Sequence, residues 1–414
     1  MLPEPTFSFT IPSINDDITL DCRIYSPPHS VLKPVEGEPA WSPRGAIVAH
    51  PYAPFGGCYD DCVVLSAAAE ILKQGFVVGT FNFRGAGSSK GRTSWQGKPE
   101  TDDYFSFVGF LVQYVHYIEG FRNCGPQRIL CVNPDTTLSS IPSEYEPSSQ
   151  PQSTNSRGMK LIIGGYSYGS LITTLLPPTE EILQRFSKVN KGTAEAEIRL
   201  RALTLAAQWN KDALLYREAQ QARKTGPHER SGASAHALAV TVGGEETEHS
   251  GRRASHEGRR SLDAFRKSME KSRKRLLGQH SSEVAEHTLV VESLVPVEIP
   301  TPQTHYLLIS LLQPPISMFA TMFTSLRSGY LAQREAKFLD HPTLVIYGDN
   351  DLFASQRRLR RWAESMKSKP TSLFHFHEIK GAGHFWREEG VETQMRGFIR
   401  EWAQDIARSH RLTE

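Results

Sequence analysis

Short, continuously apolar runs alternate along most of the chain with longer stretches in which apolar residues recur every three or four positions. The first pattern predicts strands buried on both faces, and the second predicts amphipathic helices that cover them. The expected strands are 7–12, 18–25, 45–50, 76–83, 159–164, 305–312, 343–347 and 372–379. The expected helices are 62–73, 102–118, a short one from Ser170, 180–188, 195–220, 317–337, 356–367 and 391–408. This alternation predicts an α/β protein with a mostly parallel, doubly wound sheet flanked by helices.

Two segments break the pattern. Residues 133–158 are rich in Ser, Pro, Thr, Gln and Asn, which predicts a flexible surface insertion. A larger insertion, 179–302, is helical at its start but loses that spacing over 223–280, where 13 Lys and Arg stand against 7 Asp and Glu. We expect 223–280 to be largely disordered and basic, because so polar a segment buries too little apolar surface to fold. The α/β domain is therefore expected to be discontinuous, formed by 1–178 and 303–414.

The overall composition excludes several classes of protein. The 414 residues carry a formal charge of +2, which argues against a basic coat for nucleic acid, and no nucleic-acid partner is expected. The sequence contains no run of 18 apolar residues, so no transmembrane segment is predicted. The first residues lack the pattern of a signal peptide, so we expect a cytoplasmic location, with a nuclear one still open.

Five cysteines are spread over the first third of the chain. An odd and sparse set favours a reducing compartment, and buried free thiols are the expected state. Cys58 and Cys62 have a spacing that could hold a metal, but no second ligand pair follows them. No zinc site is predicted.

The strongest local signal for chemistry is the sequence GYSYG at 165–169, which directly follows a predicted buried strand and directly precedes a helix. A serine on such a tight turn projects from strained backbone, and side chains two residues away on either side would clash with it. Gly165 and Gly169 satisfy that requirement. The following helix N-terminus would also stabilise negative charge that develops near Ser167.

A nucleophilic serine needs a base and an acid that orients the base. His384 lies in a loop of small residues after the last predicted strand, where a ring can reach over the edge of the sheet. Asp349 and Asp351 follow the preceding strand at its carboxyl end, where active sites form in open α/β sheets. Asp351 is the preferred acid and Asp349 the reserve. The order Ser167, Asp351, His384 is the one expected for this architecture.

Further motifs give the chain a resemblance to a known family. They are HPYAPFGG at 50–57, NFRGAGS at 82–88, Gly348 three residues before Asp351, and Gly381 three residues before His384. With the serine turn, these motifs resemble the α/β-hydrolase superfamily, in particular an esterase- or peptidase-like branch of its serine hydrolases. The resemblance covers roughly 1–130, 159–178 and 303–414. It leaves out 133–157 and 179–302, and an insertion before the sixth strand is not where lids usually occur in this superfamily.

The resemblance and the expected geometry together predict an oxyanion hole of two backbone N–H groups. One donor is the amide of Tyr168, directly after the serine. The other is expected from the loop after the third strand, and because Pro51 has no N–H, Tyr52 is the expected donor.

The resemblance implies a serine hydrolase that cleaves a carboxylic ester, thioester or amide of a small-molecule acyl substrate through an acyl-enzyme, with no metal or organic cofactor. Two alternatives stay open. One is a catalytically weak scaffold that binds partners through its basic insertion. The other is an acyltransferase with the same triad, because the acyl-enzyme is common to transfer and hydrolysis.

Some features allow more than one interpretation. The sequences RRAS at 252–255 and RRS at 259–261 resemble sites for basophilic kinases, so a kinase or partner could contact 223–280, although a solvated spacer is the simpler interpretation.

Arg84 could bind a substrate carboxylate, but it is expected to tie neighbouring loops together. The apolar stripe within 317–337 is expected to be core, with an acyl pocket as the alternative. The following aromatic residues, expected near the mouth of the site, hint at an apolar or aromatic acyl group: Tyr52, Phe55, Trp95, Tyr166 and Tyr168.

Overall fold

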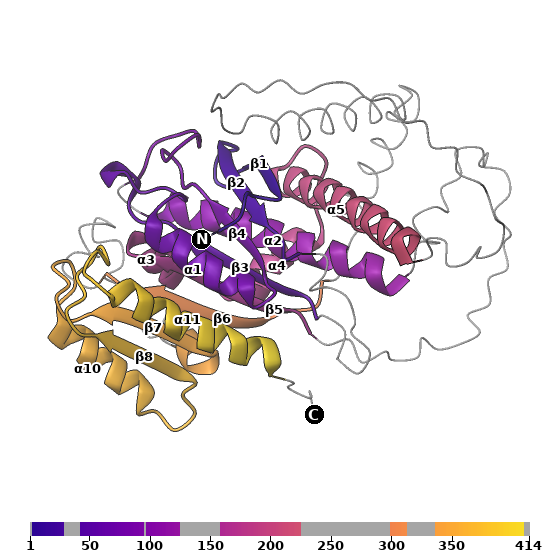
Figure 1. Cartoon of the computed structure of the whole chain (residues 1–414). Helices are drawn as coiled ribbons and strands as arrows, with labels where there is room; N and C mark the ends of the chain where they lie inside the picture. The colour runs from indigo at the N-terminus through magenta and orange to yellow at the C-terminus, as the bar shows by residue number, and fades with distance from the viewer. Residues whose placement is uncertain are drawn as a thin grey trace, which may run out of the picture. The chain divides into compact units, whose positions relative to one another are not determined.

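The computed structural model describes residues 2–28, 42–94, 97–124, 158–224, 299–312 and 336–409 (Figure 1). The chain divides into two compact units, Met1–Ala213 with Val291–Glu414, and Leu214–Val290. Within the second unit the described residues are 214–224, the end of one long helix. The sheet and the site described below belong to the first unit.

A single eight-stranded sheet in the order β1-β2-β4-β3-β5-β6-β7-β8 forms the centre of the first unit. The strand β2 runs antiparallel to both of its neighbours, and the pairs from β4 to β8 are parallel. The strands are β1 (Phe7–Pro12), β2 (Thr19–Tyr25), β3 (Arg44–Ala49), β4 (Val77–Phe81), β5 (Lys160–Tyr166), β6 (Gln303–Ile309), β7 (Thr343–Gly348) and β8 (Phe374–Ile379). The predicted α/β class and mostly parallel sheet are confirmed, with small differences at the strand ends.

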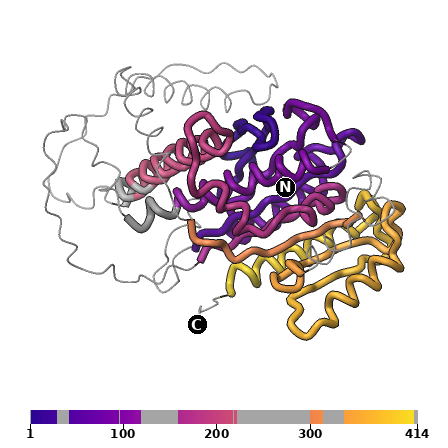
Figure 2. Tube along the Cα trace, turned by 180° about the vertical axis from the view of Figure 1, so that it is seen from behind, coloured from indigo at the N-terminus to yellow at the C-terminus, as the bar shows by residue number. Residues whose placement is uncertain are grey.

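Helices cover both faces of the sheet, as the apolar runs of the strands require. Ile47 and Ala49 of β3 face one apolar core, and Ala46 and Val48 face the other. The second core is covered by α1 (Cys62–Lys73) and α11 (Val391–Arg408). The first is covered by α2 (Lys98–Cys124), α3 (Tyr168–Leu175), α4 (Thr179–Ser187), the first part of α5 (Ala194–Lys224) and α10 (Gln356–Lys367). In both views β7 and β8 lie at the end of the sheet opposite to β1 and β2 (Figures 1 and 2).

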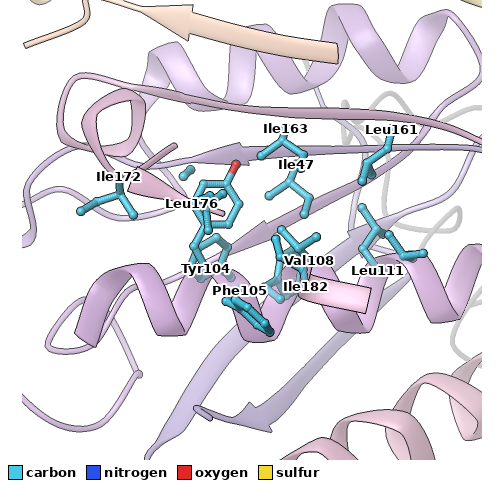
Figure 3. Close-up of a cluster of buried hydrophobic side chains, with 14 of the residues drawn as sticks. Ile47, Tyr104, Phe105, Val108, Leu111, Leu161, Ile163, Ile172, Leu176 and Ile182 are labelled. Carbon is cyan, nitrogen blue, oxygen red and sulfur yellow. The ribbon is translucent and has the colours of Figure 1, made fainter. Parts of the chain in front are cut away.

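The larger core lies between α2 and the sheet (Figure 3). Tyr104, Val108 and Leu111 project from α2 toward Ile47 of β3 and Ile163 of β5, and all five side chains are buried. Burial of one such side chain stabilises the fold by roughly 1.5–3 kcal/mol. This packing holds β3 and β5, whose ends carry the candidate site, against one rigid helix.

The helix α2 begins four residues before the predicted start at 102. Gly97 has a φ of +70°, and its carbonyl accepts hydrogen bonds from the Thr101 amide at 2.9 Å and the Thr101 hydroxyl at 2.7 Å. The first helical hydrogen bond therefore closes at Gly97. Thr101 lies inside the first turn.

The insertion 179–302 starts with the two expected helices. Ile182 and Phe186 of α4 and Trp209 of α5 are buried in the same core as the sheet. Residues 133–157, 225–298 and 313–335 lie outside the described residues, and so do the kinase-like motifs and the apolar stripe. The predicted disorder, the partner contact and the division into domains stay predictions.

The thiols differ from one another in exposure. Cys22 is buried, as predicted, Cys58 is half-buried, and Cys62 is exposed and free. The prediction of a buried thiol is wrong for Cys62, because it is the first residue of α1, and the burial of that helix begins at Val63. In the described part of the chain, no helix combines the length and the apolar character that crossing a membrane requires.

Candidate active site

Three loops at the carboxyl edge of the sheet carry the predicted triad. Ser167 directly follows β5, Asp351 lies three residues after β7, and His384 lies five residues after β8. The strands from β5 to β8 are parallel neighbours, so their carboxyl ends share one edge. Open α/β sheets bind their ligands at this edge.

Ser167 lies in a sharp turn between β5 and α3. Its φ of 56° and ψ of −113° are rare for a residue with a side chain and mark a strained backbone. A Cβ atom at Gly165 would meet the backbone of Gly169 at 2.4 Å, and a Cβ atom at Gly169 would meet the Ala49 carbonyl oxygen at 2.4 Å. The two glycines thus allow the backbone contacts that a tight serine turn requires.

The three side chains form one chain of hydrogen bonds. Ser167 Oγ lies 2.8 Å from His384 Nε2, and His384 Nδ1 lies 2.8 Å from Asp351 Oδ2. With the ring hydrogen on Nδ1, the imidazole donates to Asp351 and Nε2 accepts the Ser167 hydroxyl proton. All three residues are buried, which strengthens these bonds by excluding water.

The two candidate acids occupy different positions. Asp351 Oδ1 accepts the backbone N–H groups of Phe353 at 2.7 Å and Ala354 at 3.1 Å, which leaves Oδ2 directed at His384. Asp349 Oδ1 instead accepts the Gly381 amide at 2.6 Å and so joins the two loops. The geometry therefore favours Asp351, the preferred candidate, as the partner of the imidazole.

A mixed sheet with a strained serine turn after β5 and with the chain order Ser, Asp, His matches one known architecture. The chain has the α/β-hydrolase fold. The predicted resemblance is therefore confirmed at the level of the fold. What an α/β-hydrolase fold does depends on its site, because one fold serves many reactions.

The two residues predicted to supply oxyanion-binding amides in this α/β-hydrolase fold are Tyr168, directly after Ser167, and Tyr52, in the loop after β3. Tyr168 is the first residue of α3, so its N–H has no acceptor within the helix. No acceptor is paired with the Tyr52 N–H among the described residues, while the Tyr52 carbonyl accepts the amides of Phe55 and Gly57. The Tyr52 and Tyr168 rings pack together with centroids 4.9 Å apart. The Tyr52 loop thus packs against the residue that follows Ser167.

His50, at the end of β3, fixes the loop that carries Tyr52. Its Nε2 accepts the Phe83 amide at 2.9 Å, so the ring hydrogen is on Nδ1, which donates to the Pro51 carbonyl at 2.6 Å. His50 is fully buried, and burial lowers its pKa to about 4, so the ring stays neutral. The sequence marked His50 only as the end of a buried strand, and nothing in the sequence indicated its two partners.

Two other positioning residues were not predicted. The Tyr166 hydroxyl, from within the serine turn, donates to the His384 carbonyl at 2.8 Å. The buried Lys337 ammonium donates to the carbonyls of Thr173 at 3.0 Å and Leu176 at 2.8 Å, at the C-terminus of α3. A cation there complements the dipole of the helix whose N-terminus carries Ser167.

The aromatic residues expected at the mouth of the site divide into separate groups. Tyr166 and Tyr168 are buried, so their rings belong to the core, and this part of the prediction is wrong. Tyr52 is half-buried and Phe55 is 82% exposed. Trp95 lies outside the described residues.

Arg84 ties loops together, as predicted. Its guanidinium donates to both carboxylate oxygens of Asp103, to both of Asp16 and to Ser13 Oγ, at 2.7–3.3 Å. Burial opposes its charge, but the bonds to Asp103 and Asp16 outweigh that effect and raise the pKa of Arg84. With these donors used within the protein, Arg84 does not act as a substrate ligand.

The described residues include no group of three or more His, Cys, Asp or Glu that could hold a metal ion. Cys58 and Cys62 therefore have no described partners with which to form such a site.

Comparisons with known proteins found solved structures that are only distantly similar to this chain. No family model matches the chain, and no curated protein matches it significantly. A lid-free α/β serine hydrolase from Xanthomonas campestris is 14% identical, with 99% of each chain covered and a TM-score of 0.41. Est1E from Butyrivibrio proteoclasticus, solved with ferulic acid, is 9% identical over 95% of this chain and 97% of that one, with a TM-score of 0.39. An esterase from Pyrococcus furiosus is 11% identical over 96% and 92%, with a TM-score of 0.37.

Similarities this distant carry no argument about activity. The assignment of the fold rests on the sheet order and the serine turn of this chain. The function is argued below from the side chains of the site.

Proposed function

We propose that the protein is a serine hydrolase that cleaves a carboxylic ester, thioester or amide through an acyl-enzyme intermediate. The observation that carries the proposal is the unbroken hydrogen-bond chain from Ser167 through His384 to Asp351. A buried serine hydroxyl that donates to an imidazole, itself oriented by a carboxylate, is the arrangement of an activated nucleophile.

In the first half of the reaction, Ser167 Oγ attacks the substrate carbonyl carbon while His384 Nε2 takes the hydroxyl proton. Asp351 holds the imidazole with its hydrogen on Nδ1 and stabilises the imidazolium that forms. The amides of Tyr52 and Tyr168 would donate to the oxyanion of the tetrahedral intermediate. When the intermediate collapses, His384 returns the proton to the leaving alcohol, thiol or amine, and the acyl group remains on Ser167.

The second half repeats the same steps with water. His384 removes a proton from a water molecule, whose oxygen attacks the acyl-enzyme carbonyl. The oxyanion again lies between the two tyrosine amides. Collapse releases the carboxylic acid and returns the proton to Ser167 Oγ, so the enzyme is restored without a cofactor.

The direct test is labelling of the purified protein with a fluorophosphonate probe, which reacts with activated serines. We expect the wild type to be labelled, and we expect Ser167→Ala and His384→Ala to lose labelling, because the first removes the nucleophile and the second its base. Ser368→Ala is the matched control, since Ser368 is exposed at the end of α10 and bonds only locally to Ser365 in the described structure. An unlabelled wild type with a native circular dichroism spectrum would refute the proposal.

A further inference from the structure

Large apolar side chains are exposed at few positions of the described chain, and most of them border the candidate site. They are Phe55 at 82% exposure, Leu215 at 55%, Leu352 at 89% and Phe385 at 53%. Leu352 directly follows Asp351, Phe385 directly follows His384, and Phe55 lies three residues after Tyr52. Single exposed apolar residues such as Leu215 need no explanation, but three on the loops of one site do.

On one side, aromatic contacts connect the exposed residue to the oxyanion loop. The Phe55 ring packs edge-on against Tyr52 with centroids 5.5 Å apart, and Tyr52 packs against Tyr168 at 4.9 Å. Tyr168 is the residue after Ser167. A continuous series of ring contacts therefore leads from the exposed Phe55 to the residue after Ser167.

A second path reaches the triad from the side of the base. The Phe385 ring lies 5.8 Å from the half-buried Phe353 ring, and Phe353 lies 4.6 Å from the His384 imidazole. Leu352 stands between Asp351 and Phe353 in the same loop. A charged group also borders this path, since the Arg387 guanidinium lies 5.7 Å from the Phe385 ring centroid.

We propose that Phe55, Leu352 and Phe385 form an apolar rim that binds the hydrocarbon chain of the substrate acyl group. The substrate class would then be esters or thioesters of straight-chain acids long enough to reach this rim. This inference rests on the proposed serine hydrolase activity. Binding of an apolar group to a water-exposed rim is favourable because it removes apolar surface from water. The apolar part of a substrate bound at Ser167 is the group held nearest to this rim.

The test is a series of 4-nitrophenyl esters from acetyl to decanoyl, measured below their critical micelle concentrations. Complete burial of one methylene group raises kcat/KM by about fourfold. A rim that covers half of the surface of the acyl chain raises it by about twofold for each methylene group. We expect octanoyl to exceed butyryl by roughly tenfold or more. A triple variant, Phe55→Ser, Leu352→Ser and Phe385→Ser, should reduce this ratio to about twofold.

Leu215→Ser is the matched control, because Leu215 is also an exposed leucine but lies on α5, a helix without candidate site residues. It should leave the ratio unchanged. All four substituted positions are exposed, so the variants are expected to fold, which a thermal unfolding curve would verify.

The outcomes separate the two proposals. An enzyme that is labelled by fluorophosphonate and cleaves the short esters with no chain-length preference would overturn the rim and leave the hydrolase intact. A preference that persists in the triple variant, or a rate increase only above the critical micelle concentration, would also overturn it. If no ester is cleaved and no probe is bound, the hydrolase and the rim both fail.

Discussion

Two polar clusters with buried centres follow strands of the same sheet, and they differ in how their side chains are bonded. The Arg84 cluster, made of Arg84, Asp103, Asp16 and Ser13, has five hydrogen bonds on one guanidinium, although its Asp16 side chain is exposed. The triad of Ser167, His384 and Asp351 joins its members in single file. Both follow strand ends, yet only the second ends on a nucleophilic oxygen.

The comparison shows how the pattern of hydrogen bonds separates a structural cluster from a reactive one. Each of the three guanidinium nitrogens of Arg84 already donates to an oxygen of the protein, and a guanidinium has no acceptor. The Ser167 hydroxyl donates its hydrogen bond to His384, and its oxygen is the candidate nucleophile. The following predictions test this distinction, from the largest expected effect to the smallest.

Asp351→Asn should lower kcat/KM by about 10⁴-fold, equivalent to about 5.5 kcal/mol. An amide that donates to His384 Nδ1 holds the ring hydrogen on Nε2, so the imidazole can no longer accept the serine proton. The measurement is steady-state hydrolysis of a short 4-nitrophenyl ester.

Asp349→Asn is the matched control, because an asparagine oxygen can still accept the Gly381 amide. Its kcat/KM should stay within about threefold of the wild type, since no proton of the reaction passes through it. Equal losses in the two variants would contradict the assignment of Asp351.

Arg84→Met should lower the free energy of unfolding by about 3–5 kcal/mol, because the fully buried Asp103 would lose its compensating charge. Urea denaturation followed by tryptophan fluorescence would measure the change. Arg84→Lys should cost less, since an ammonium keeps the charge and loses the bidentate geometry.

The Arg84 variants also test whether the cluster is separate from catalysis. Below the urea transition, we expect both to keep fluorophosphonate labelling at Ser167. Loss of labelling in a folded Arg84→Lys protein would mean that the cluster acts on the site and that the contrast with the triad is wrong.

His50 combines features of the two clusters. Both of its ring nitrogens are hydrogen-bonded within the protein, and yet it supports the candidate site. Its pKa is lowered to about 4 in the folded protein by burial, against about 6.5 in an unfolded chain. Between these values the unfolded state binds more protons, so the free energy of unfolding falls as the pH drops from 6.5 to 4. His50→Gln should remove up to about 3 kcal/mol of that decline, measured by denaturation between pH 4.5 and 7.

His305→Gln is the comparison variant for this effect. Burial lowers the pKa of His305 to about 4 as well, but His305 lies in β6 and bonds to the Gln303 carbonyl. Both variants should flatten the pH dependence of stability. Only His50→Gln should also lower kcat, by about tenfold, because it loosens the loop of Tyr52. A similar kcat in both variants would remove His50 from the support of the site.

Local patterns predicted the elements well and their ends less well. The helices at 62–73 and 391–408 were predicted to the residue, because each has a clear apolar face and a turn before or after it. The start of α2 was placed four residues late, since the polar residues of its first turn hide its beginning. Cys62 was expected to be buried and is exposed. The apolar spacing predicts a helix, but it does not show which end of the helix is exposed to solvent.

The candidate site was predictable where its signal was local. Ser167 lies within five residues that define a turn, and His384 lies in a loop of small residues after a strand. The choice between Asp349 and Asp351 depended on which carboxylate faces the imidazole, and both aspartates follow the same strand. The bonds of His50 and Arg84 link residues far apart in the chain, so no local pattern indicates them.

The sequence alone determined the alternation of strands and helices, the serine turn and the order of the three candidate catalytic residues. These features depend on periodicity and on steric limits within a few residues. Both are already present in the unfolded chain. Only the tertiary structure decided that Asp351 faces His384, that Arg84 binds Asp103 and Asp16, and that three apolar residues on the loops of the site are exposed. Each of these three features depends on where side chains from distant segments point. Those orientations become fixed only when the folded sheet brings the ends of its strands to one edge.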